Sequence, residues 1–191
     1  IESLARPGGN ITGTAWSAPE ITAKILQVLQ EAAPRAKRVA AIGNTSMRGA
    51  HEYGESTRQG ASKLGMEARA FPTGRPEEIP KALEQIAAFR PQALYVALDP
   101  VLAAGLGDIV AFALRHKLPT IANASLFTDA GGLLCYGPNV KELGEHTAGY
   151  VTRILAGAKP ADLPIQLPTK FELVVNLKTA KLIGLKIPQS I

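Results

Sequence analysis

Cysteine, aromatic residues and long apolar runs are scarce in this sequence of 191 residues. Its one cysteine, Cys135, excludes an internal disulfide and any metal site built from several cysteines. The five phenylalanines, four tyrosines and single tryptophan are dispersed, which is not typical of a stacking platform for single-stranded nucleic acid. No apolar run approaches the roughly 18 residues that a membrane span needs. These shortages exclude several classes of function before any motif is considered.

Basic charge is present but is not concentrated. The net charge is +5, and the densest basic cluster is Arg35, Lys37 and Arg38. That cluster lies between a predicted helix and a predicted strand, where charged side chains are usually solvated. Because a nucleic-acid site requires a concentrated basic surface, we expect no nucleic-acid partner.

Sequence signatures of catalysis are missing as well. There is no Gly-x-Ser-x-Gly motif, no phosphate-binding loop and no His-Glu-x-x-His helix. The three histidines, His51, His116 and His146, fall in different predicted helices without a cysteine or acidic partner at ligand spacing. The Gly-x-Gly at 105–107 lies within a predicted helix and lacks the third glycine of a dinucleotide-binding loop. We therefore expect no enzymatic activity, no catalytic or metal-binding residue and no cofactor.

The sequence does contain a regular alternation of helix and strand patterns. Apolar residues at helical spacing predict helices over 19–33, 46–64, 76–89 and from 99 to 113. Short apolar runs predict strands over 38–43, 67–72, 93–98, 119–122 and 133–137. Strands that are apolar on both faces and alternate with helices indicate a parallel sheet covered on both sides. The predicted fold class is therefore α/β, with a doubly wound parallel sheet.

In such a sheet, ligands bind outside the carboxyl ends of the strands. The residues expected there are small, polar or aromatic, and the candidates for ligand binding are Asn44, Thr45, Ser46, Asp99, Asn123 and Tyr136. An alternative stays open for each: the polar residues cap the helices that follow them, and Tyr136 covers the core with its hydroxyl in water.

The segment GGLLCYGP, residues 131–138, carries the aromatic candidate at the exit of a short strand. Gly137 allows either a close approach of the backbone to a ligand or a turn that no side chain permits. Cys135 lies within the apolar strand, so we expect a buried and unreactive thiol.

A family resemblance is carried by SLARPGGNITG, KRVAAIGN, ALDP, LPTIA and the long segment from GGLLCYGPNV to NLKTAKLIGL. These segments closely resemble the extracytoplasmic substrate-binding proteins of ABC transporters with the type 1 periplasmic-binding fold, in the subgroup associated with aromatic amino acids. The resemblance runs over essentially the whole chain. It implies two α/β lobes joined by three crossing segments, with the solute held between the lobes.

The same resemblance implies how the chain is divided. Residues 1–13 correspond to a crossing segment and 14–137 to the second ligand-binding lobe. Residues 138–191 correspond to a returning helix at about 139–156, a last crossing strand at 171–176 and a C-terminal helix. We therefore expect most of the amino-terminal lobe, and any secretion signal, to precede this chain.

The function implied is the binding of a small solute, an amino acid and an aromatic one in particular, for delivery to an ABC transporter permease. The implied location is periplasmic, or extracellular and anchored to the membrane. We expect the chain alone to bind solute poorly and to self-associate through exposed apolar surface. Two alternatives stay open: an effector-sensing module of a regulator or receptor with the same fold, and a doubly wound enzyme that uses Asp99 as acid or base.

Overall fold

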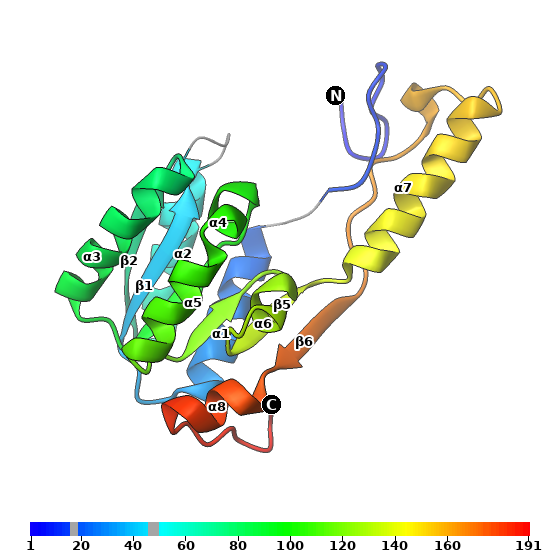
Figure 1. Ribbon diagram of the computed structural model, residues 1–191. Coiled ribbons are helices and arrows are strands. Elements are labelled where there is room, and N and C mark those ends of the chain that lie inside the picture. The colour runs from blue at the N-terminus through cyan, green and yellow to red at the C-terminus, as the bar shows by residue number, and fades with distance from the viewer. Residues whose placement is uncertain (16–18, 46–49) are drawn as a thin grey trace. The chain divides into compact units, whose positions relative to one another are not determined.

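A computed structural model describes residues 1–15, 19–45 and 50–191 of the chain (Figure 1). The helices are α1 (Pro19–Ala32), α2 (Ala50–Lys63), α3 (Ile79–Phe89), α4 (Pro100–Ala104), α5 (Leu106–Arg115), α6 (Leu126–Asp129), α7 (Val140–Leu155) and α8 (Leu177–Ile183), with 3₁₀ turns η1 (Pro76–Glu78) and η2 (Pro160–Asp162). The strands are β1 (Arg38–Asn44), β2 (Glu67–Thr73), β3 (Ala93–Val96), β4 (Thr120–Ala122), β5 (Leu134–Pro138) and β6 (Phe171–Val175).

The chain divides into two compact units. One consists of Ile1–Ala18 with Pro138–Glu172, and the other of Pro19–Gly137 with Leu173–Ile191. We call the first the α7 unit and the second the sheet unit. The lobe boundaries expected from the sequence concern a whole two-lobed protein, and they remain a prediction.

The described strands form a six-stranded sheet in the order β2-β1-β3-β4-β5-β6. The pairs β1–β2, β1–β3, β3–β4 and β4–β5 are parallel, and Ile42 of β1 lies opposite both Phe71 and Val96. This arrangement confirms the predicted α/β class. Because β2 lies on one side of β1 and β3 on the other, the strand order reverses between β1 and β3, which makes this pair the switch point of the sheet.

Two separate apolar cores cover the two faces of the sheet. Successive side chains of β1 alternate between them: Ala40 and Ile42 belong to the core with α3, α4 and α5, whereas Val39 and Ala41 belong to the core with α1. Figure 1 shows α3, α4 and α5 in front of the sheet and α1 and α2 behind it. Since burial of one Ile or Leu side chain contributes about 1.5–3 kcal/mol, both faces have to be covered for such a strand to be stable.

The segment after β3 departs from the prediction. A single helix was expected from 99 to 113, but α4 ends at Ala104 and α5 begins at Leu106. Gly105 between them has non-helical dihedral angles, φ −109° and ψ 21°. A Cβ atom at Gly105 would lie 2.4 Å from Cδ1 of Ile79, so the junction packs closely on α3. The prediction that the Gly-x-Gly lies within one helix is therefore wrong, because Gly105 separates α4 from α5.

The four-residue helix α6 was not predicted, because it is too short to show a period. Phe127 of α6 is fully buried. A Cβ atom at Gly132 would lie 2.1 Å from the Phe127 ring. Gly132 therefore allows the chain to pass this ring on its way into β5.

Gly137, near the end of β5, touches the backbone that follows β4. A Cβ atom there would lie 1.9 Å from the carbonyl oxygen of Asn123. The sequence predicted a close approach to a ligand or a turn, whereas the structure shows a close approach to a neighbouring segment of the chain, which brings the ends of two strands together.

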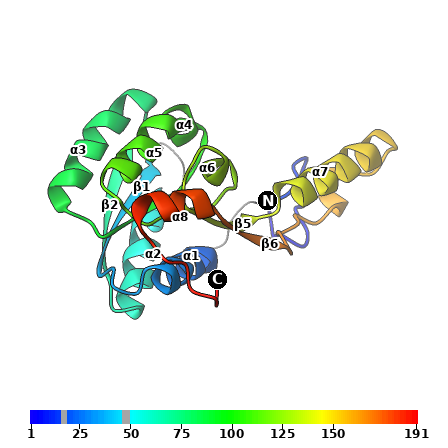
Figure 2. The same cartoon turned by 60° about the horizontal axis from the view of Figure 1, so that its bottom comes forward.

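Helix α8 belongs to the sheet unit. Its Ala180 is buried in the core that also contains α1, and the Thr179 hydroxyl donates a hydrogen bond to Gly131 O at 2.8 Å. Asn176 caps the helix and donates from Nδ2 to Thr128 O at 3.1 Å. Figures 1 and 2 show α8 at the end of the sheet where β1 begins, opposite to the end where α4 lies.

The α7 unit is held by hydrogen bonds between its two chain segments. Gln166 N donates to Gly13 O at 3.0 Å and Ala15 N donates to Gln166 O at 2.8 Å. On α7, Leu143 and Tyr150 are buried, and the Tyr150 hydroxyl donates to Pro164 O. Three further apolar residues of α7 are exposed: Val151, Ile154 and Leu155.

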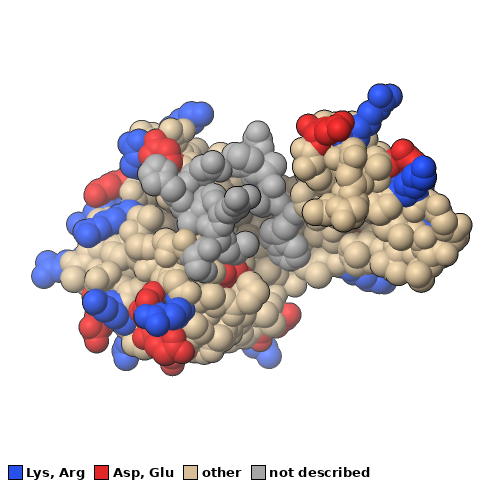
Figure 3. Space-filling model, turned by 90° about the horizontal axis from the view of Figure 1, so that it is seen from above, with Lys and Arg blue, Asp and Glu red and all other residues tan. Residues whose placement is uncertain are grey.

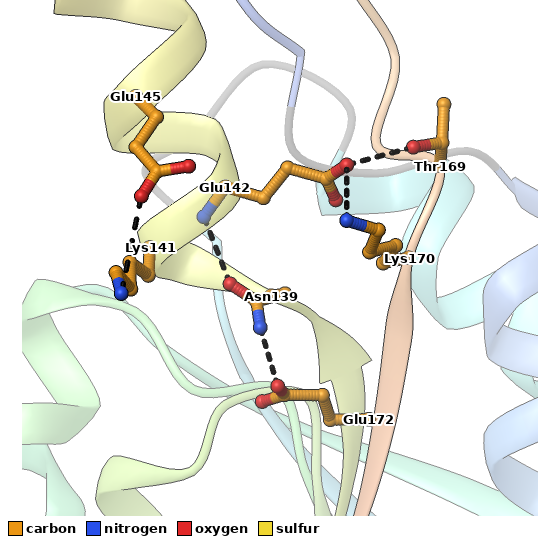
Figure 4. A network of polar contacts seen from close by, with 7 residues as sticks. All are labelled: Asn139, Lys141, Glu142, Glu145, Thr169, Lys170 and Glu172. Carbon is orange, nitrogen blue, oxygen red and sulfur yellow. Dashed lines mark hydrogen bonds and ion pairs between the residues drawn. The ribbon is translucent and has the colours of Figure 1, made fainter.

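A polar network fixes the start of α7 (Figure 4). Asn139 Oδ1 accepts a hydrogen bond from Glu142 N at 2.8 Å, and Asn139 Nδ2 donates to Glu172 Oε1. The Glu142 carboxylate accepts a hydrogen bond from the Thr169 hydroxyl at 2.9 Å and lies 3.7 Å from Lys170 Nζ. The start of α7 is therefore tied to the segment that leads into β6.

Replacement of Gly137 by alanine should destabilise the sheet unit. Because the new Cβ atom would overlap the carbonyl of Asn123, β4 or β5 must shift, at a cost of about 1–3 kcal/mol. Gly107→Ala in α5 is the matched control, since its Cβ atom would meet nothing within 4 Å. Urea unfolding should show a loss of stability for the first variant only. Equal stability of Gly137→Ala and the unaltered chain would contradict the contact.

Candidate functional site

The switch point of the sheet brings two of the predicted site residues together. Asn44 ends β1 and Asp99 follows β3, the neighbouring strand. Asn44 Nδ2 donates a hydrogen bond to Asp99 Oδ2 at 2.5 Å, across 55 positions of sequence. Chain connections leave this point toward opposite faces, because α2 follows β1 on one face and α4 follows β3 on the other. This is where an open α/β sheet binds ligands.

Asp99 is also a helix cap. Its Oδ1 accepts a hydrogen bond from Leu102 N at 2.9 Å, and Pro100 occupies the first turn of α4. The capping alternative is therefore correct for Asp99. It does not exclude a role in binding, because the side chain is only half-buried and its second oxygen faces Asn44.

Asn123 holds two strand ends together and is not a cap. Its Oδ1 accepts a hydrogen bond from Leu98 N, just after β3, at 2.7 Å. The residue before α6 is Ser125, which makes no side-chain capping bond. The capping alternative is therefore wrong for Asn123. With Gly137 packed on its backbone, this residue links the ends of β3, β4 and β5.

The remaining candidates differ in how they lie. Thr45 is exposed, and its backbone N–H donates to Thr73 O at 2.9 Å. Ser46 lies outside the described residues. Tyr136 is half-buried and packs against the core that contains α1, as the covering alternative requires, and its role in ligand binding stays a prediction. Cys135 beside it is buried, as predicted.

A second carboxylate lies near this edge, and it was not predicted. Glu78 Oε2 accepts a hydrogen bond from Gly74 N, just after β2, at 2.7 Å. That bond is the main reason why the pKa of Glu78 lies below its ordinary value, and Arg75 at 3.3 Å lowers the pKa further. In the sequence, Glu78 looks like an ordinary acid at a helix start. The available signal was its position four residues after a strand end that carries Gly74.

Charges of both signs are scattered over the face seen in Figure 3, with no large patch of one sign there.

Within the described residues, no three His, Cys, Asp or Glu side chains are grouped to hold a metal ion. The ring of His116 lies against the Phe112 ring, with centroids 4.4 Å apart and the ring planes tilted by 40°, and the side chain of His51 lies outside the described part. None of the helices described is long and apolar enough to cross a membrane. The arrangement suits hydrogen bonding to a polar solute.

Asp99→Ala should destabilise the sheet unit by about 1–2 kcal/mol, because the cap of α4 is lost. Asp99→Asn should cost less, since asparagine caps helices as well as aspartate does. Glu84→Ala on the exposed side of α3 serves as the control and should lie within about 0.5 kcal/mol of the unaltered chain. Urea unfolding measures all three. If Asp99→Ala is as stable as the control, the cap contributes nothing.

Comparisons with known proteins agree with this geometry. The sequence pattern of the ABC transporter substrate binding protein family matches residues 1–191. A tyrosine-binding protein from Clostridioides difficile (strain R20291) is 25% identical over 186 residues, which are 97% of this chain and 53% of that protein. The chain thus spans about half the length of this curated relative.

Two solved structures are similar over almost the whole chain. One is an ABC domain in complex with L-Trp from Streptococcus pneumoniae, with a TM-score of 0.89 and 26% identity over 100% of this chain and 65% of that one. The other is the ligand-free, open structure of a substrate binding protein with adhesive properties from Clostridium difficile, with a TM-score of 0.72 and 26% identity over 99% and 63%. The chain therefore belongs to the ABC transporter substrate-binding protein family, whose members bind solutes and are not enzymes.

Proposed function

We propose that the whole protein is the solute-binding component of an ABC importer and that it binds a small solute, an amino acid, at the carboxyl edge of the sheet. The observation that carries this proposal is the hydrogen bond between Asn44 and Asp99 at the switch point. It places an amide and a carboxylate side by side where such sheets bind ligands. We call Asn44, Thr45, Asp99, Asn123 and Tyr136, with Ser46 outside the described part, the rim.

The hydrogen bonds of the rim support binding over catalysis. Both oxygens of Asp99 accept hydrogen bonds, from Leu102 N and from Asn44, so the carboxylate is held in one orientation. Among the described residues of the rim, none pairs a nucleophile with a base. A few fixed polar groups beside an apolar surface are the usual composition of a small-molecule site.

The chemistry of the rim suits an amino acid. The polar groups of Asn44, Asp99 and Asn123 suit its charged end, and the half-buried ring of Tyr136 suits contact with its body. Two relatives are described as binding tyrosine and L-Trp, and aromatic amino acids are therefore the first solutes to test.

The proposed mechanism is closure of two lobes about the solute. A second lobe, contributed by a longer chain, covers the rim by a hinge motion of the kind found in periplasmic binding proteins. The closed form then delivers the solute to a membrane permease. In this role the protein is located outside the cytoplasm, either in the periplasm or outside the cell and anchored to the membrane.

Thermal unfolding of the whole protein against a panel of amino acids and other metabolites tests the function. A solute at about a hundred times its dissociation constant should add roughly 2.7 kcal/mol to the stability of the folded state. We expect an increase in melting temperature with tyrosine, tryptophan or both, and none with sugars. A panel in which only sugars raise the melting temperature would contradict the proposal.

The double variant Asp99→Ala, Tyr136→Ala tests the rim itself. It removes the charged group and the aromatic ring, so the increase caused by the amino acid should disappear. Glu84→Ala is the control, because it removes a carboxylate from the same unit far along α3. Unchanged affinity in the double variant would show that the solute binds elsewhere.

A further inference from the structure

The side-chain amide of Asn123 has only one possible orientation. Its Oδ1 accepts a hydrogen bond from Leu98 N at 2.7 Å, and since that partner is a backbone donor, the oxygen of the amide has to face it. The NH₂ group is then turned the other way. No described residue accepts a hydrogen bond from it, and Asn123 is half-buried, so Nδ2 can donate to a molecule at the rim.

The surroundings hold this orientation. Gly137 packs on the carbonyl of Asn123 and prevents the backbone from shifting. Leu98 is buried, with 8% of its surface exposed, and among the described residues the other acceptor for its N–H is Val96 O at 2.9 Å, two positions back. Rotation of the amide would place NH₂ against N–H and leave a buried donor poorly satisfied, which costs about 1–3 kcal/mol.

Asp99 presents the opposite chemistry, one residue from Leu98. Its oxygens accept from Leu102 N and Asn44 Nδ2, and as a carboxylate it has no hydrogen to donate. The rim therefore offers a fixed donor and a fixed anionic acceptor. A solute that carries a carboxylate and an ammonium group satisfies both, and this is the pattern of a free α-amino acid.

We infer that Asn123 is a specificity-determining residue: its Nδ2 donates to the carboxylate of the solute, while Asp99 accepts from the ammonium group. This inference rests on the proposed function and assigns one charged group of the amino acid to each residue. A purely structural role for Asn123, as a link between β3 and β4, predicts a loss of stability on substitution but no change in which solute is preferred.

Asn123→Asp separates the two roles. The variant keeps an oxygen for Leu98 N and replaces the NH₂ donor by a negatively charged acceptor. The probes are tyrosine, tyramine, which lacks the carboxylate, and 3-(4-hydroxyphenyl)propionate, which lacks the ammonium group, together with the matching trio of tryptophan, tryptamine and indole-3-propionate. Calorimetric titration of the whole protein gives the affinity for each.

In Asn123→Asp, the affinity for the amino acid should fall by about 30-fold or more, because its carboxylate meets a like charge. The affinity for the matching amine should stay the same or rise, so the ratio of the two affinities falls. Asp99→Asn should act in the opposite sense: it weakens the amino acid and the amine but not the propionate. Gln85→Glu, which makes the same change from amide to carboxylate on the exposed side of α3, is the control and should leave the ratio within about threefold.

The outcomes are distinguishable. If the unaltered protein binds neither amino acid nor its analogues, the proposed function with aromatic amino acids fails. If it binds the amino acid but Asn123→Asp leaves the ratio of amino acid to amine unchanged, the function stands and the role of Asn123 is overturned. Should Asn123→Asp not fold, Asn123→Ala replaces it: the ratio should fall about tenfold, and an unchanged ratio again overturns the inference.

Discussion

The hydrogen bond between Asn44 and Asp99 is the contact on which the site depends. It joins the ends of β1 and β3, the two neighbouring strands between which the strand order reverses. The last paired residues of β1 and β3 are Ile42 and Val96, and this side-chain hydrogen bond joins the two chain segments beyond that pair. The same carboxylate begins α4, so the direction of that helix and the position of the charge are set together. A single side chain thereby couples the fold of the sheet unit to the chemistry of its edge.

Glycines and an amide extend this coupling across the sheet. Gly137 brings the end of β5 against Asn123, and Asn123 reaches back to Leu98 beside Asp99. The ends of β1, β3, β4 and β5 thus form one connected edge. Because both faces of the sheet are covered by apolar cores, the strands cannot shift individually, and the polar groups at this edge are held in place by the packing beneath them.

Much of this architecture could be predicted from the sequence, because buried parallel strands and amphipathic helices leave strong patterns. The strand ends, and with them Asn44 and Asp99, followed from those patterns. What could not be predicted depends on contacts between distant residues: the break at Gly105 on Ile79, the short α6 around Phe127, and the use of Asn123 as a link and not a cap. Glu78 was missed for a different reason: its partner, Gly74 N, is only four positions away, but the sequence does not show that the Glu78 side chain turns back to that N–H and does not point into solvent.

Binding at the edge of the sheet can be observed directly by NMR of the whole protein titrated with L-tyrosine. If the solute binds at the rim, the side-chain amide signals of Asn44 and Asn123 and the backbone amide signals of Leu98 and Leu102 should shift together as the solute is added. The side-chain amide of Asn176, at the other end of the sheet unit, should not move. Shifts centred on Asn176 and α8, with the amide signals of the rim unchanged, would contradict binding of the solute at the rim.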